Sequence, residues 1–336
     1  MSDAAVALPL HVLTGFLGSG KTTLLNRLLT APRFSDTAVL INEYGDVPID
    51  HLLVREAHEE TVVLASGCVC CTLRTDLVEQ LSALLSQRAR GEVPQFKRMI
   101  LETTGLADPA PIVQTVLKHP ALSDALYLDG IVCTVDAQLG ESTLRTHPEA
   151  LKQVALADRL VLTKLDLAPA TAVATLEGAL RLENPGAPIL RTTGTADDAQ
   201  LLIGSGHLDT RSVLYSEFRA RPDARASTHA HDHLHDIKQL AVTLDRPVRF
   251  ESFALWVSTL SQLWAERVLR IKAVVSAIGE PTPIAVQSVQ HVVYPPLNLP
   301  AMPELAGRTL VVVLTRGLSV QQMREIESSL RDLISR

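Results

Sequence analysis

Three shortages limit what the 336-residue chain can do: aromatic residues, positive charge and long apolar runs are all scarce. Aromatic residues make up 4% of the chain, so stacking on bases is not expected to be its main activity. The 31 Lys and Arg residues are outnumbered by 37 Asp and Glu residues, and the net charge of −6 argues against nucleic acid as a partner. No apolar run is long enough to cross a bilayer, and Met1 to Pro9 lack the positive run of a signal peptide. We therefore expect a cytoplasmic protein that uses neither nucleic acid nor a membrane.

Cysteine is also scarce, and its distribution argues against a disulfide framework. Only four cysteines occur, and three of them lie between Cys68 and Cys71. A disulfide framework spreads its cysteines along the chain, whereas a tight cluster more often binds metal or takes part in redox chemistry in a reducing cytoplasm. The fourth cysteine, Cys133, lies within an apolar run and is expected to pack in a core.

The order of apolar runs predicts two domains joined by a linker. Leucine-rich helical stretches lie between several short strand candidates, at 10–14, 38–41, 61–64, 99–101, 130–135 and 160–162. This alternation predicts an α/β domain over residues 1–200, with a mainly parallel sheet and flanking helices. Residues 201–236 form a polar, histidine-rich stretch that we interpret as a linker. Strand and helix patterns resume after it and predict a smaller α+β domain over residues 237–336.

A phosphate-binding loop follows the first predicted strand. The segment Gly15 to Thr22 reads GFLGSGKT and fits G-x-x-x-x-G-K-[ST] without gaps, between a strand and a helix. The backbone N–H groups of such a loop surround phosphate oxygens, and the helix N-terminus favours the anion. Lys21 is expected to reach the β- and γ-phosphates, and Thr22 to ligate Mg²⁺. The remaining loop residues expected to hold nucleotide are Gly15, Gly18, Ser19 and Gly20.

The base is expected to be guanine. Thr163-Lys164-Leu165-Asp166 follows an apolar run and so lies just past a strand end, where parallel sheets bind ligands. The carboxylate of Asp166 can accept hydrogen bonds from N1–H and the 2-amino group of guanine, a donor pair that adenine lacks. Lys164 can lie along the loop and the base. A surface Lys/Asp pair without a role is the alternative reading of this motif.

A carboxylate and a glycine follow the strand that ends near Leu101. Glu102 can hold Mg²⁺ through water, and the N–H of the nearby Gly105 can sense the γ-phosphate. Residues Gly105 to Pro109 are then expected to be a mobile, nucleotide-sensing segment. The alternative is that Glu102 is an acidic helix cap.

The cysteine cluster predicts a transition-metal site. Cys68, Cys70 and Cys71 offer three thiolates close together, which favour Zn²⁺, Cu⁺ or Fe–S chemistry and by geometry also Co²⁺. Three ligands leave one tetrahedral position open, and this suits an ion that must be passed on. Glu43 follows another predicted strand end, so it is a candidate for the fourth ligand or for a switch residue. The alternative is that these cysteines are core hydrophobes.

The predicted linker contains four histidines at alternate positions, His229, His231, His233 and His235. In an extended segment their imidazoles line one face and form a weak, exchangeable metal site. A soluble linker without a metal role explains the same run equally well.

Together these motifs resemble the CobW-type P-loop GTPases, metallochaperones of the same broad class as the nickel-insertion GTPases of urease and hydrogenase. The matching stretches are Thr14 to Thr23, Ile41 to Asp50, Ser66 to Cys71, Glu102 to Pro109 and Thr163 to Asp166. The resemblance implies GTP hydrolysis to GDP and phosphate, coupled to the binding or delivery of Zn²⁺, Co²⁺ or a related ion to a client. It assigns phosphate and Mg²⁺ contacts to residues 20–23, including Thr23, and the magnesium-side carboxylate to Glu102. It makes Asp166 the reader of guanine and the three clustered cysteines the metal ligands.

The mechanism that we expect links the two sites through the segments that flank the cysteines. GTP with Mg²⁺ orders residues 43–50 and 105–109, the thiolate site assembles, and hydrolysis releases the ion to a client. No catalytic base or arginine finger is evident, so intrinsic turnover is expected to be slow. Two other functions fit part of the sequence: a P-loop kinase of a small molecule, and a nucleotide-independent metal buffer or storage protein.

Overall fold

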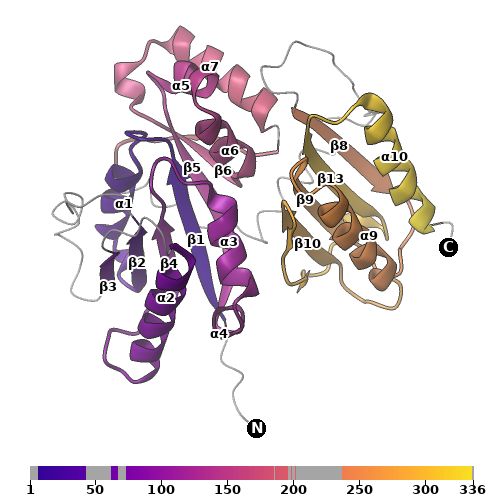
Figure 1. The fold of residues 1–336 in the computed structure, drawn as a ribbon, viewed down its shortest axis with the longest axis horizontal. Helices are drawn as coiled ribbons and strands as arrows, with labels where there is room; N and C mark the ends of the chain where they lie inside the picture. Colours follow the sequence, from indigo (N-terminus) through magenta and orange to yellow (C-terminus); the bar gives the residue numbers. More distant parts are fainter. Residues whose placement is uncertain are drawn as a thin grey trace. The chain divides into compact units, whose positions relative to one another are not determined.

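The computed structural model describes residues 7–42, 62–66, 73–184, 186–195, 198, 201 and 237–334. The chain forms two compact units, Met1–Gly206 and His207–Arg336 (Figure 1). Residues 202–236, which contain almost all of the predicted linker, lie outside the described residues, so the predicted domain boundaries at 200 and 237 stay predictions. None of the described helices combines the length and the apolar character needed to span a membrane.

The first unit alternates strands and helices as the sequence predicted. Its strands are β1 (Leu8–Gly15), β2 (Thr37–Asn42), β3 (Val62–Ser66), β4 (Arg98–Glu102), β5 (Leu126–Asp136), β6 (Arg159–Thr163) and β7 (Ile189–Arg191). Its helices are α1 (Lys21–Leu29), η1 (Pro32–Phe34), α2 (Leu73–Ala89), α3 (Pro109–Lys118), α4 (Pro120–Ser123), α5 (Gly140–Thr146), α6 (Pro148–Leu156), η3 (Leu165–Leu167) and α7 (Ala170–Glu183).

The seven strands form one parallel sheet in the order β3-β2-β4-β1-β5-β6-β7. Alternate strand residues face opposite sides, because successive side chains of a strand point to opposite faces. On one side Leu13 and Ile41 pack with α1, and on the other Leu10 and Leu40 pack with α2, α3 and α4. The expected parallel α/β fold is therefore confirmed. All strands end at the same edge of the sheet, which is where such folds bind ligands.

Helices α5, α6 and α7 form a further core with β5 and β6. Cys133 lies in this core with 1% of its surface exposed, so the prediction that it is a packing residue is confirmed. Burial raises the pKa of its thiol to about 12, and the side chain therefore stays protonated and apolar at neutral pH.

The second unit is an antiparallel α+β domain, again as predicted. Five strands are hydrogen-bonded in the order β11-β10-β9-β13-β8, and β12 pairs with β10. Helices α9 and α10 share one core with the sheet, built around Phe253, Val257 and Ile326. The bounds are β8 (Ile237–Leu244), α9 (Phe250–Leu263), β9 (Val268–Val275), β10 (Ile284–Val289), β11 (Val292–Val293), β12 (Leu297–Asn298), η5 (Pro303–Leu305), β13 (Thr309–Arg316), α10 (Val320–Arg331) and η6 (Asp332–Ile334). A reciprocal capping box between Ser319 and Gln322 begins α10.

Candidate functional site

The phosphate loop connects β1 to α1 at the ligand-binding edge of the sheet. Gly15 has φ 142°, and a Cβ there would lie 2.3 Å from Oγ1 of Thr134 on β5. Gly20 has φ 90° and precedes α1, which begins without a side-chain cap. The backbone N–H groups in the first turn of α1 therefore receive no hydrogen bond from an N-cap side chain. A bound anion can accept hydrogen bonds from these groups.

Neighbouring strand ends hold the loop in place. The hydroxyls of Ser19 and Thr134 lie 2.7 Å apart, and the hydroxyl of Thr163 donates to the carbonyl oxygen of Ser19 at 2.7 Å. Lys21 is 8% exposed, and its Nζ donates to the carbonyl oxygens of Gly15 at 3.0 Å and Phe16 at 3.3 Å. The ammonium group therefore lies against the loop, as expected of a phosphate-binding lysine.

A pair of side chains suited to Mg²⁺ lies between α1 and the end of β4. Oγ1 of Thr22 donates to Oε1 of Glu102 at 2.7 Å, and Glu102 is 2% exposed. Glu102 pairs with Leu13 in the β1–β4 ladder, which places its carboxylate beside the loop that follows β1. Hydroxyl and carboxylate oxygens are the hard ligands that Mg²⁺ prefers, so the two side chains fit that ion.

The second part of the site is a pocket of about 530 Å³ on the other side of the loop. Gly20, Thr23, Lys164, Asp166 and Thr193 are among the residues that line it. It therefore brings the start of α1 together with the Thr163–Asp166 motif, as a nucleotide site requires.

Lys164 is held at this pocket by a residue that the sequence did not indicate. It adopts a left-handed conformation with φ 54°, and its Nζ donates to Oδ2 of Asp136 at 2.7 Å. The other oxygen of Asp136 accepts hydrogen bonds from the backbone N–H groups of Gln138 and Leu139. Asp136 ends an apolar strand, so the only sequence signal was its position at a predicted strand end.

Asp198 orders the loop that closes the pocket and was also missed. Its side chain is 1% exposed and accepts from the N–H and the hydroxyl of Thr193, at 2.7 and 2.8 Å, and from the N–H of Gly194 at 3.0 Å. Arg27 of α1 lies 3.7 Å from the same carboxylate. No motif marks Asp198, because its role depends on contacts that only folding creates.

The predicted nucleotide-sensing segment packs directly on the phosphate loop. A Cβ at Gly105 would lie 2.6 Å from the backbone nitrogen of Leu17, so no larger residue fits there. Nε2 of Gln153 on α6 donates to the carbonyl oxygens of Gly105 at 3.1 Å and Ala107 at 3.0 Å. Asp108 then caps α3 by accepting from the N–H of Ala110 at 2.9 Å.

The predicted transition-metal ligands lie outside the described residues. These are Glu43, Cys68, Cys70, Cys71, His229, His231, His233 and His235. Within the described ranges, no group of three or more His, Cys, Asp and Glu side chains could hold a metal ion. The strands that lead to the cysteines and to Glu43 are described, however. Asn42 at the end of β2 is paired with Ser66 at the end of β3, and Ile41 is paired with Glu102.

Comparisons with known proteins agree with this geometry. Residues 9–191 match the family described as CobW/HypB/UreG, nucleotide-binding domain, and residues 237–332 match the cobalamin synthesis protein CobW C-terminal domain. The chain is 33% identical to the zinc chaperone YjiA of Escherichia coli over 314 residues, 93% of this chain and 94% of that protein. It is 29% identical to the zinc chaperone CobW of Pseudomonas aeruginosa over 317 residues, 84% and 80% of the two chains. The crystal structure of the Zn(II)-bound E. coli YjiA GTPase matches with a TM-score of 0.71 at 26% identity, over 97% of this chain and 99% of that one.

Proposed function

Because the chain belongs to the CobW/HypB/UreG family of P-loop GTPases and carries a CobW C-terminal domain, we propose that it is a metallochaperone that hydrolyses GTP to deliver a metal ion to a client protein. The ion is Zn²⁺ rather than Co²⁺, since the relatives that match most of its length are named zinc chaperones. Its ligands are the thiolates of Cys68, Cys70 and Cys71, with Glu43 as the candidate fourth ligand.

The observation that carries this proposal is the order of strand ends along one edge of the sheet. Ser66 of β3 is paired with Asn42 of β2, and Ile41 of β2 is paired with Glu102 of β4. Cys68 and Glu43 follow the first two of these strands within two residues, and Glu102 lies beside Thr22. The strand before Glu43 therefore neighbours the strand of the magnesium-side carboxylate directly, and the strand before the cysteines lies one strand further along the sheet. A structural change at one site can reach the other through β2.

The described residues support nucleotide binding in the following roles. The N–H groups of the loop from Gly15 to Gly20 and the ammonium of Lys21 bind phosphate oxygens. Thr22 and Glu102 would hold Mg²⁺, which when bound neutralises charge on the β- and γ-phosphates.

The base is held on the other side of the phosphate loop. Asp166 accepts hydrogen bonds from guanine, and Lys164 is held at the same pocket by Asp136. Gly105, which is packed against Leu17, reports the γ-phosphate to the segment that ends at Pro109.

Metal titration of the full chain tests the coupling. Zn²⁺ affinity is measured with GDP bound and with a non-hydrolysable GTP analogue bound, and Co²⁺ competition checks the identity of the ion. We expect tighter Zn²⁺ binding with the GTP analogue and, by linkage, an equal tightening of the analogue by Zn²⁺. Cys70→Ser should abolish the difference, whereas Cys133→Ala, which removes a core thiol, should preserve it. Equal Zn²⁺ affinity in both nucleotide states would instead support a nucleotide-independent buffer.

A further inference from the structure

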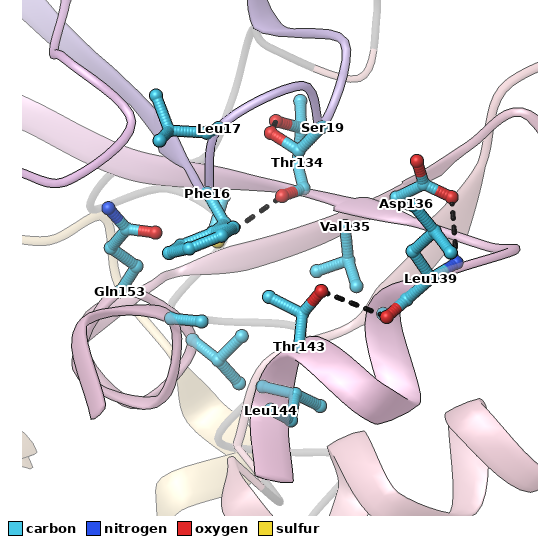
Figure 2. Close-up of a pocket in the computed structure, with 14 residues that line it drawn as sticks. Phe16, Leu17, Ser19, Thr134, Val135, Asp136, Leu139, Thr143, Leu144 and Gln153 are labelled. Carbon is cyan, nitrogen blue, oxygen red and sulfur yellow. Dashed lines mark hydrogen bonds between the residues drawn. The ribbon is translucent and has the colours of Figure 1, made fainter. Parts of the chain in front are cut away.

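A second pocket lies behind the phosphate loop, separate from the nucleotide pocket. It has a volume of about 130 Å³ and is lined by the loop residues Phe16 and Leu17, the end of β5, and helices α5 and α6 (Figure 2). An engineered protein cavity of about 150 Å³ binds benzene. The pocket is therefore the right size for a molecule with one small ring.

The walls of this pocket are mostly apolar and carry no free charge. Val135, Leu144 and Val154 are each at most 6% exposed. Asp136 stands at the rim, but one of its oxygens accepts from Lys164 and the other from two backbone N–H groups ahead of α5. Burying an ion without a partner is costly, so a charged molecule is excluded.

One buried acceptor atom in the pocket wall has no hydrogen-bond donor among the described residues. Gln153 is 0% exposed, and both of its Nε2 bonds go to the carbonyl oxygens of Gly105 and Ala107. Its Oε1 is buried and has no hydrogen-bond partner among the described residues. Figure 2 shows this amide oxygen turned toward Phe16. A buried carbonyl oxygen without a donor costs free energy, and that cost is recovered when a donor arrives.

We propose that this pocket binds a small neutral molecule that has a ring-sized apolar body and one N–H or O–H group, which donates to Oε1 of Gln153. Ordered water is the other possible occupant, but a buried water needs two to four polar partners. The hydroxyl of Thr143, which also lines the pocket, already donates to the carbonyl oxygen of Leu139 at 2.9 Å. The other two lining hydroxyls, of Ser19 and Thr134, are hydrogen-bonded to each other at 2.7 Å.

Occupancy of the pocket is expected to affect GTP binding. An occupant contacts Gln153, which holds Gly105, and it also contacts Phe16 and Leu17 of the phosphate loop. By fixing the Gln153 amide it stabilises the present position of residues 105–107 and opposes their rearrangement around a γ-phosphate. This consequence rests on the proposed nucleotide-sensing role of that segment, whereas the binding site itself does not.

Phenol and anisole provide matched probes of similar shape, because phenol has the hydroxyl donor and anisole does not. Calorimetry on the nucleotide-free full chain should show saturable binding of one phenol. Anisole should bind roughly three- to tenfold more weakly, which is the worth of one neutral hydrogen bond. Equal affinities, or no binding of either probe, would overturn the proposal and leave the pocket to water.

Two variants that place a larger side chain in the pocket provide a second test, and their folding is checked separately. Ala150→Leu and Leu144→Phe should each abolish phenol binding, and thermal unfolding checks that they fold. Ala170→Leu, an exposed change at the start of α7, is the matched control and should bind phenol normally. Unchanged phenol affinity in a folded pocket-filled variant would also overturn the proposal.

Measurements of GTP affinity distinguish phenol binding in the pocket from the proposed effect of that binding on the nucleotide site. Phenol should weaken GTP binding in the unmodified chain and have no effect in Ala150→Leu. Phenol binding without any change in GTP affinity would overturn the coupling alone. Since Zn²⁺ is absent from these measurements, their outcome is distinct from that of the metal titration.

Discussion

The hydroxyl of Thr22 donates a 2.7 Å hydrogen bond to the carboxylate of Glu102, although 80 positions separate the two residues. The pairing of β1 with β4 makes this contact, because it brings the residue after Leu101 to the start of α1. A hydroxyl and a buried carboxylate in this arrangement offer the hard oxygen ligands that Mg²⁺ prefers, and they support the proposal that Thr22 and Glu102 hold that ion.

Glu102→Gln tests the magnesium side of the site. The amide keeps the size of the side chain but removes its charge, so we expect a weaker response to Mg²⁺ and GTP hydrolysis reduced about 10- to 100-fold. Hydrolysis rates measured across a magnesium titration check this. Glu92→Gln, which alters a surface ion pair with Arg90, is the control and should leave the rate unchanged. A normal magnesium dependence in Glu102→Gln would contradict the assignment.

Asp166→Asn tests the choice of base. The amide can no longer accept two hydrogen bonds from guanine, so GTP affinity should fall at least about 100-fold. Xanthosine triphosphate, which presents a carbonyl where guanine has the 2-amino group, should gain affinity in return. Competition binding with both nucleotides measures the exchange. The exposed Asp124→Asn, which lies near the start of β5 away from the site, should retain normal GTP affinity.

Asp198→Ala tests whether the order of the Thr193–Gly194 loop supports nucleotide binding. The change removes three hydrogen bonds from the loop and should raise the KM for GTP about tenfold, with a loss of about 1–3 kcal/mol in unfolding free energy. We expect kcat to change little, because Thr193 and Gly194 line the pocket proposed for the base and do not belong to the loop that binds the phosphates. Steady-state kinetics separate the two constants. Glu177→Gln removes a carboxylate that pairs with Arg181 and Arg191 and should leave KM unchanged.

The pH dependence of stability should reveal a pair of titratable side chains on the neighbouring strands β1 and β5. Nδ1 of His11 lies 3.4 Å from Oδ2 of Asp129. Burial, with a smaller effect of Arg98 and Arg159, lowers the pKa of His11 from 6.5 to about 4. Burial, with a smaller effect of Asp158, raises the pKa of Asp129 from 3.8 to about 6. Both side chains are therefore largely neutral in the folded chain between pH 4 and 6.

The two shifts have opposite consequences for stability. Because the unfolded chain protonates His11 first, its contribution is present above pH 6.5 and is lost as the pH falls toward 4. The contribution of Asp129 is present below pH 3.8 and is lost as the pH rises through about 6. The two slopes nearly cancel in the unmodified chain.

In Asp129→Asn only the effect of His11 on stability should remain, so the unfolding free energy should fall by up to about 3 kcal/mol as the pH is lowered from 6.5 to 4. His11→Gln should produce the opposite slope. Urea unfolding of both variants and the unmodified chain at four pH values checks this, and parallel profiles would contradict it.

The sequence predicted the nucleotide half of the site because its signals are local. The glycines at 15 and 20 are required by the backbone of a single loop, and Lys21, Thr22 and Asp166 belong to short motifs whose positions relative to strand ends can be inferred from apolar runs. The alternation of those runs with helices was likewise sufficient to predict a parallel sheet followed by an α+β domain.

The first part of β5 was not predicted, for a related reason. The strand candidate began at Gly130, whereas β5 begins at Leu126. Asp129 and Tyr127 interrupt the apolar pattern there, and burial raises the pKa of the Asp129 carboxyl to about 6, with Nδ1 of His11 on the neighbouring strand 3.4 Å away. The burial of this carboxyl against neighbouring strands cannot be recognised from one strand alone.

The local motifs could be found from residue order alone: a phosphate-loop sequence, the Thr163–Asp166 motif proposed for guanine and a cluster of three cysteines, all on a predicted α/β fold. The distant groups that hold those motifs in place became visible only in the folded chain. Asp136 fixes Lys164, Asp198 orders the Thr193–Gly194 loop at the pocket proposed for the base, and Gln153 ties Gly105 to α6. Each is a polar residue without a motif, and its role comes from burial beside a partner far away in the chain. That partner is set by strand order and helix packing, which local residue patterns do not encode.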